Sequence, residues 1–96
     1  MNKYEVAEAL TQSGTVLLKK YEVSNGRSAK FVERPVVNME APRKVTGFKP
    51  GAVQIEGTLL ELKDSDKFEV DSDGNLKISI MGPDGYYWVR FTYKIG

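Results

Sequence analysis

The chain has 96 residues, 41% of them hydrophobic and 28% charged, and a formal net charge of +1. This length indicates one domain over residues 1–96, and this hydrophobic fraction excludes an intrinsically disordered chain. A near-neutral net charge gives no general electrostatic attraction to nucleic acid or to membranes. Neither cysteine nor histidine occurs, which excludes disulfides, thiolate metal sites and the usual base of a nucleophilic catalyst.

No secretory signal pattern is present, because no charged segment is followed by an apolar h-region. The longest apolar runs are a few residues, far short of the ~20 that a membrane-spanning helix needs. We therefore expect a cytoplasmic protein that has no membrane partner.

The first predicted element is a short helix over residues 3–12. Asn2 and Glu5 have the spacing of an N-cap and its capping-box partner, and Gly14 is a natural helix end. An apolar stripe at helical spacing follows the cap, made by Tyr4, Val6, Ala7 and Leu10. We expect this helix to cover one face of a sheet.

A β-hairpin is predicted next, with strands over residues 15–23 and 28–37 around Asn25-Gly26, a strong hairpin signal. Two registers are open. A two-residue turn would pair Tyr21 with Lys30 and Lys20 with Phe31. A one-residue shift pairs Tyr21 with Phe31, Val23 with Ala29 and Glu22 with Lys30. We favour the shifted register because it keeps apolar and charged side chains on separate faces.

Residues 41–51 hold two prolines and two glycines, which weaken a strand. They predict a loop, the longest irregular segment of the chain. One further strand is expected over residues 52–62.

Two turns organise the C-terminal third. A three-residue loop at 72–74, with Gly74 in the left-handed conformation, pairs Val70 with Leu76, Glu69 with Lys77 and Phe68 with Ile78. A four-residue loop at 82–85 pairs Ile80 with Tyr87, Ile78 with Val89 and Leu76 with Phe91. Both turns select the same core face: Phe68, Val70, Leu76, Ile78, Ile80, Tyr87, Val89, Phe91, Tyr93 and Ile95.

These elements predict an α+β fold: a short N-terminal helix packed on a curled, mainly antiparallel sheet of about five or six strands in hairpin order. A small β-barrel with one helix is the alternative.

The outer face of the last hairpin is the first candidate binding surface. It presents Trp88, the only tryptophan, together with Tyr86, Met81, Arg90 and Lys77. Aromatic residues beside Met and Arg are typical of binding hot spots. In this register Lys77 lies opposite Arg90. If the sheet closed, or if the 41–51 loop covered it, Trp88 would belong to the core instead.

The second candidate surface is the basic loop, where Arg43, Lys44 and Phe48 could contact an acidic surface or phosphates. It belongs to a basic region over residues 19–49, which is balanced by an acidic stretch over residues 61–73. The two stretches either form solvated faces that pair with each other or make a bipolar binding surface.

The sequence contains no complete motif for catalysis or metal binding. No phosphate-binding glycine loop or nucleophile elbow occurs. Glu69, Asp71 and Asp73 resemble the start of an EF-hand loop, but its twelfth position is Ile80, which cannot bind calcium. A carboxylate pair for glycoside hydrolysis would need a cleft that a hairpin tip does not provide. We expect no metal, no cofactor and no enzymatic activity.

The sequence therefore favours a non-enzymatic protein-binding module. Its size and lack of catalytic residues are typical of the small inhibitors or adaptors that phages direct at host proteins. Two alternatives stay open: a single-stranded nucleic-acid binder that uses residues 19–49, and a structural protein that assembles through its strand edges. The partner and the oligomeric state are not encoded in any motif.

Overall fold

A computed structural model of the chain describes residues 1–24 and 30–95. One helix, α1 (Lys3–Ser13), packs on an antiparallel sheet, which confirms the α+β fold. The described residues form eight strands rather than five or six. They are β1 (Thr15–Val23), β2 (Val32–Glu33), β3 (Arg43–Lys49), β4 (Ala52–Ile55), β5 (Thr58–Glu61), β6 (Lys67–Val70), β7 (Leu76–Met81) and β8 (Tyr87–Ile95).

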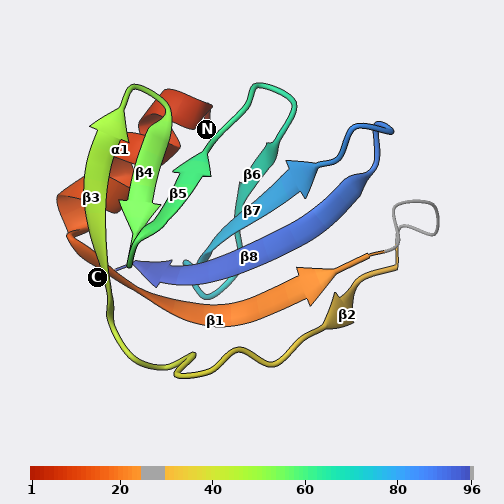
Figure 1. Cartoon of the computed structure of the whole chain (residues 1–96), viewed down its shortest axis with the longest axis horizontal. Helices are drawn as coiled ribbons and strands as arrows, with labels where there is room; N and C mark the ends of the chain where they lie inside the picture. Colours follow the sequence, from red (N-terminus) through yellow and green to blue (C-terminus); the bar gives the residue numbers. More distant parts are fainter. Residues whose placement is uncertain (25–29, 96) are drawn as a thin grey trace.

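The sheet is open and has the order β5-β4-β3-β1-β8-β7-β6, with β2 paired to the far end of β1. Strands β3 to β5 and β6 to β8 each follow in hairpin order. Between these two hairpin units lies β1, which pairs along its length with β8 (Figure 1). The chain therefore adopts a curled sheet and not the alternative closed barrel.

Helix α1 begins at the predicted capping box. The Glu5 backbone N–H donates to Asn2 Oδ1 at 2.9 Å, and the Asn2 N–H donates to Glu5 Oε1 at 3.0 Å. Gly14 ends the helix with φ +78°, a conformation that favours glycine. Three members of the predicted stripe are buried, whereas Tyr4 is exposed.

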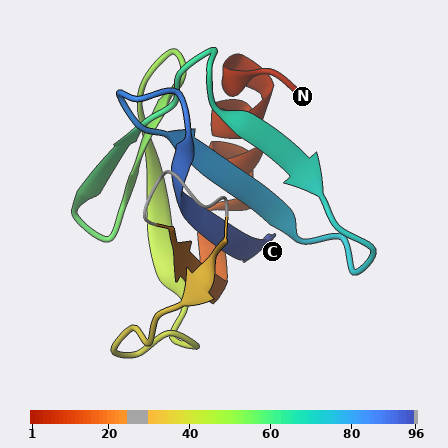
Figure 2. The same ribbon diagram turned by 90° about the vertical axis from the view of Figure 1, so that its right-hand side faces the viewer.

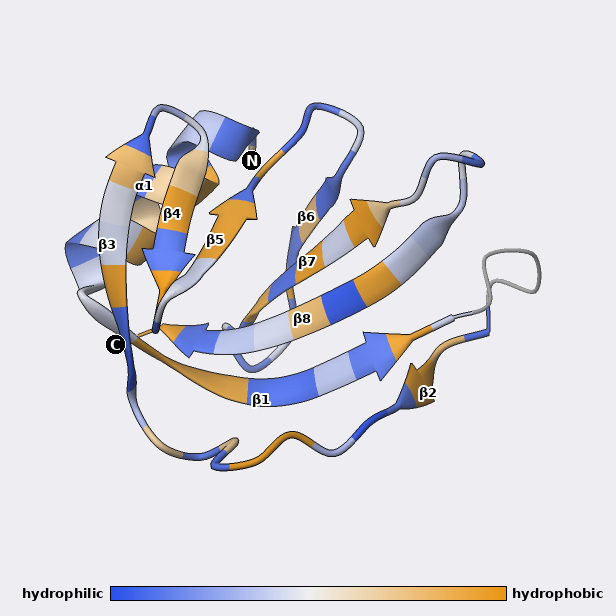
Figure 3. Cartoon of the chain, viewed as in Figure 1, coloured by the Kyte–Doolittle hydropathy of each residue, from blue (hydrophilic) through white to orange (hydrophobic). Residues whose placement is uncertain are grey.

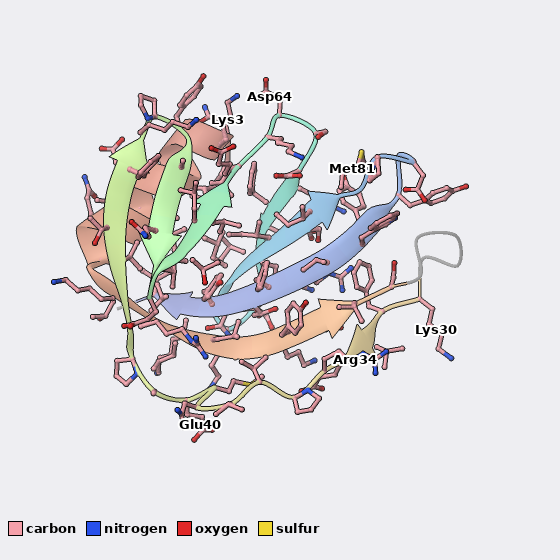
Figure 4. All side chains as sticks on the ribbon, viewed as in Figure 1. Lys3, Lys30, Arg34, Glu40, Asp64 and Met81 are labelled. Carbon is pink, nitrogen blue, oxygen red and sulfur yellow. The ribbon has the colours of Figure 1, made fainter. Side chains whose placement is uncertain are left out.

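The helix packs against β1, β3 and β4 at one end of the curled sheet (Figure 2). A Cβ at Gly47 would lie 3.3 Å from the Thr11 side chain, so this glycine lets β3 approach the helix closely. At the helix start, Lys3 Nζ lies 3.3 Å from Asp64 Oδ1 of the β5–β6 connection (Figure 4).

One hydrophobic core joins the helix to both hairpin units, and apolar residues recur along most of the strands (Figure 3). Burying these side chains is the main favourable term in folding. The buried members are Val6, Ala7, Leu10, Val16, Leu18, Val45, Val53, Ile55, Leu62, Leu76, Ile78 and Tyr93.

The predicted register of the first hairpin is wrong. Val23 pairs with Val32 and Glu22 with Glu33, and β2 has two residues instead of the ten expected over residues 28–37. The predicted turn at Asn25-Gly26 and the predicted partner Ala29 lie outside the described residues. Phe31 leaves the ladder and lies under the Arg90 guanidinium, whose Cζ is 3.9 Å from the ring centroid.

Residues 41–51 do not form the predicted loop, because strand β3 occupies most of the segment. Pro42 precedes this strand and Pro50 follows it, so neither proline removes a donor from its interior. Gly47, the glycine inside the strand, serves the close approach of the helix.

Residues 52–62 form two strands, β4 and β5, and not the single strand predicted. Glu56 and Gly57 both have positive φ, +48° and +84°, as a two-residue hairpin turn requires. Glu56 Oε1 accepts the Lys44 backbone N–H at 2.6 Å, which supports this unusual conformation for a glutamate.

The C-terminal third confirms one register and corrects the other. The β6–β7 pairs are those predicted, and Gly74 has φ +80°. The β7–β8 register is displaced by two residues, so that Ile80 pairs with Val89 and Lys77 with Thr92. The loop is one residue longer than predicted and a bulge near Met81 adds one more. Because the total displacement is two residues, the same side chains still face the core. Arg90 consequently lies opposite Ser79 and not opposite Lys77.

Two residues of the predicted core face are exposed. Val70 is 59% exposed and Ile95 is 36% exposed. Val70 ends the edge strand β6, and Ile95 ends β8, where fewer neighbours cover a side chain.

Candidate functional site

The predicted aromatic surface lies at the tip of the β7–β8 hairpin. Trp88 is 40% exposed and Tyr86 is 47% exposed. Met81, labelled in Figure 4, ends β7 at the same hairpin and is half-buried. The Trp88 indole is therefore neither sealed in the core nor covered by residues 41–51. We call Met81, Tyr86 and Trp88 the hairpin-tip patch.

The turn before Trp88 holds the indole ring of Trp88 and the backbone of Tyr86. The Trp88 indole Nε1–H donates to Asp84 Oδ1 at 2.9 Å, and the Tyr86 backbone N–H donates to the same oxygen at 3.2 Å. A Cβ at Gly82 would lie 2.6 Å from two carbons of the indole. The ring thus rests directly on this glycine, and any larger residue there would displace it.

Arg90 lies on the outer face of β8 with partners of its own. Its Nη1 is 3.8 Å from Glu22 Oε1, and its Nε–H donates to Ser79 Oγ at 3.3 Å. The Phe31 ring covers the guanidinium, a cation–π arrangement. These contacts restrain Arg90, because Glu22 of β1, Ser79 of β7 and Phe31, which precedes β2, all hold it.

Lys77 and Arg90 line a charged hollow of about 320 Å³ on the outer face. Its walls carry four basic and three acidic side chains and so have no strong net sign. The lining residues are Lys19, Lys20, Glu22, Asp71, Asp73, Asn75, Lys77, Arg90 and Thr92. Asp71 Oδ1 accepts the backbone N–H groups of Asn75 and Asp73, and these bonds hold the pKa of Asp71 below its usual value.

The second predicted surface is dispersed by the strand that replaces the loop. Phe48 is exposed and lines a groove of about 490 Å³ between α1 and the β3–β4 turn. Lys44 is exposed near the other end of β3. Arg43 lines a separate pocket on the concave side, so the structure does not bring Arg43, Lys44 and Phe48 together.

This Arg43 pocket has a volume of about 270 Å³ and lies where β1 and β3 diverge. Most of the lining residues also belong to the hydrophobic core or pack against it. The pocket is therefore an opening at the side of this core. The lining residues are Leu18, Tyr21, Val36, Arg43, Ile55, Thr58, Leu60, Phe91 and Tyr93.

The Arg43 guanidinium lacks good hydrogen-bond acceptors for several of its N–H donors. Its Nε–H is buried and has no hydrogen-bond acceptor among the described residues. Its Nη2 donates to the carbonyls of Val37 and Asn38, both at 3.5 Å, longer than a good N–H···O bond. A buried donor that lacks a partner destabilises the fold by about 1–3 kcal/mol, which makes this arginine unusual.

Stacked aromatic rings form one wall of the pocket. The ring centroids of Tyr21 and Phe91 are 5.2 Å apart, and those of Phe91 and Tyr93 are 5.8 Å apart. Burial raises the pKa of Tyr93 to about 12, and the nearby charge of Arg43 opposes this shift. The Tyr93 phenol is therefore neutral at physiological pH.

The sequence predicts a loop position for Arg43 and a purely core role for Phe91 and Tyr93, and it gives no sign of the pocket that they share. Strand alternation puts Arg43 on the same face as the buried Val45. That alternation becomes visible only once residues 43–49 are identified as a strand.

Within residues 1–24 and 30–95, no group of three or more His, Cys, Asp or Glu side chains could hold a metal ion. In the same residues, no helix is long and apolar enough to cross a membrane.

Comparisons with protein-family models, with curated protein sequences and with solved structures found no significant match to this chain. The function must therefore be argued from the surfaces themselves.

Proposed function

We propose that this protein is a non-enzymatic binding module that engages another protein through the hairpin-tip patch. The observation that supports this most is the state of Trp88. Its indole is 40% exposed, yet a hydrogen bond to Asp84 and contact with Gly82 hold it in place.

Exposed but restrained aromatic side chains suit recognition of a protein surface. Trp and Tyr are enriched among the residues that dominate binding energy. A ring that is already fixed loses little conformational freedom on binding, so more of the contact energy is available for affinity. Tyr86, 47% exposed, is a second aromatic residue at the same hairpin tip, and Met81 ends the strand that leads into it.

The narrower form of the proposal is a small cytoplasmic inhibitor or adaptor of the phage type. It rests on the short chain and on the absence of cysteine and histidine from the sequence. The nucleic-acid alternative has less support, because Arg43 lines the concave pocket and Lys49 is paired with Glu61 at 3.1 Å.

The test compares quantitative capture from native cell lysate by wild-type protein and two variants. Trp88→Ala removes the indole. Tyr4→Ala is the matched control, because Tyr4 is an aromatic residue of similar exposure, 54%, on the distant helix. We expect a protein that wild type and Tyr4→Ala retain and that Trp88→Ala loses at least tenfold.

Circular dichroism must show that all three proteins are folded. Gly82→Ala serves as a second variant, because it keeps the indole but forces it to move. We expect it to weaken capture as well. Equal capture by wild type, Trp88→Ala and Gly82→Ala would refute the proposed surface, as would the lack of any specifically retained protein.

A further inference from the structure

We propose that the Arg43 pocket binds a small monocarboxylate with an apolar body, whose carboxylate pairs with the Arg43 guanidinium. This inference is independent of the hairpin-tip patch, which lies on the opposite end of β8 from Tyr93.

The walls favour an apolar body. Three stacked aromatic rings line the pocket together with aliphatic side chains of β1, β4 and β5. The volume of about 270 Å³ is near the lower end of the range for small-molecule sites, roughly 300–1,000 Å³. A medium-chain aliphatic acid or an arylalkanoic acid matches this size and chemistry.

The charge favours an anionic head. Among the described residues that line the pocket, Arg43 is the only charged one and none carries a carboxylate. In the described part of the chain, the observed ion pairs use Lys3, Lys49, Lys67 and Arg90, and none uses Arg43. A positive charge in an otherwise apolar pocket attracts a complementary anion.

The hydrogen bonding favours a carboxylate over a neutral head. A guanidinium carries five N–H donors in a planar fork, and here the buried Nε–H has no acceptor while Nη2 makes two long bonds. A carboxylate accepts two parallel N–H bonds from such a fork, and an alcohol cannot. The neutral phenol of Tyr93 and the hydroxyl of Thr58, both in the lining, add possible donors.

The experiment titrates the whole protein with octanoate, 3-phenylpropionate and 1-octanol, with affinities measured from backbone amide chemical shifts. At least one of the two acids should bind and shift the amides of residues 18–21 and 91–93. That acid should bind at least tenfold more tightly than octanol. The relative affinities of the two acids assign the apolar body as aliphatic or aromatic.

Two methionine variants test whether the Arg43 charge causes the preference for acid over alcohol. Arg43→Met keeps an apolar stem and removes the guanidinium, so the tenfold preference for acid should disappear. Lys44→Met removes the same charge from the exposed neighbouring residue and should keep the preference.

If Arg43→Met fails to fold, Leu60→Trp on the edge strand β5 fills the pocket with Arg43 in place, and it should abolish acid binding. The proposal is overturned if neither acid binds wild type at millimolar concentration, or if octanol binds as tightly as the acids. It is also overturned if a folded Arg43→Met keeps the preference, or if a folded Leu60→Trp still binds acid.

Discussion

Aromatic side chains on β8 occupy two contrasting environments within six residues. Trp88 stands 40% exposed at the hairpin tip, and Tyr93 is 5% exposed in the wall of the Arg43 pocket. The difference follows from alternation along the strand, because Tyr93 lies on the core face with Phe91 whereas Trp88 lies on the opposite face near the turn. One strand thus supplies both candidate binding surfaces.

The buried phenol of Tyr93 makes stability depend on alkaline pH. Its pKa is about 12 in the folded chain and about 10 when unfolded. Below pH 10 both states are protonated and the contribution is complete. Between pH 10 and 12 the unfolded chain loses its proton first, so the free energy of unfolding should fall by roughly 2–3 kcal/mol.

Urea unfolding followed by circular dichroism at pH 8.5 and pH 11.5 would measure this loss. Tyr93→Phe removes the phenol and is the control, and it should lose distinctly less stability. Equal losses in wild type and Tyr93→Phe would contradict the expected coupling.

The helix illustrates what one local motif contributes to an element. Asn2 and Glu5 satisfy each other's backbone N–H groups at the start of α1. We expect Asn2→Ala to lower the free energy of unfolding by about 1 kcal/mol, measured by chemical denaturation. Asn2→Asp retains an acceptor at the N-cap and should stay close to wild type. A loss as large in Asn2→Asp as in Asn2→Ala would show that the cap bond is not the cause.

Elements with strong local signals were the predictable ones. The capping box, Gly14 and the 72–74 turn specify their conformations through residues adjacent in sequence. Strand β3 was missed because the role of Gly47 depends on Thr11, which is far away in the chain. The β4–β5 turn was missed because Glu56 adopts positive φ with support from the distant Lys44 N–H.

The two candidate sites also differ in whether the nearby sequence predicts them. The outward position of Trp88 followed from alternation within one hairpin and from its turn. The place of Arg43 depends on where β3 sits relative to β1 and β8, which is a long-range arrangement. No pattern near Arg43 encodes that arrangement.

Across the whole molecule, the first and last strands meet at the centre of the sheet. Strand β1 pairs with β8 from Val16↔Ile95 to Val23↔Val89. Contacts between residues so distant in sequence close a long loop, which slows folding. Central strands also need extensive unfolding before they open, whereas edge strands open locally.

Native-state hydrogen exchange should therefore rank the strands. We expect amides in the β1–β8 ladder, such as those of Leu18 and Tyr93, to exchange only through global unfolding. Amides of the edge strand β5 should exchange at least tenfold faster. Exchange of β5 at the global rate would instead indicate that the sheet opens as a single cooperative unit.

Only two registered pairs, Thr15↔Lys44 and Val16↔Arg43, join β1 to β3. The two parts of the sheet therefore share only a short junction, and Arg43 lies in that junction. The lining of the Arg43 pocket comes from both sides of this junction, from β1 and β8 on one side and from β4 and β5 on the other. The proposed acid would therefore contact both hairpin units at once.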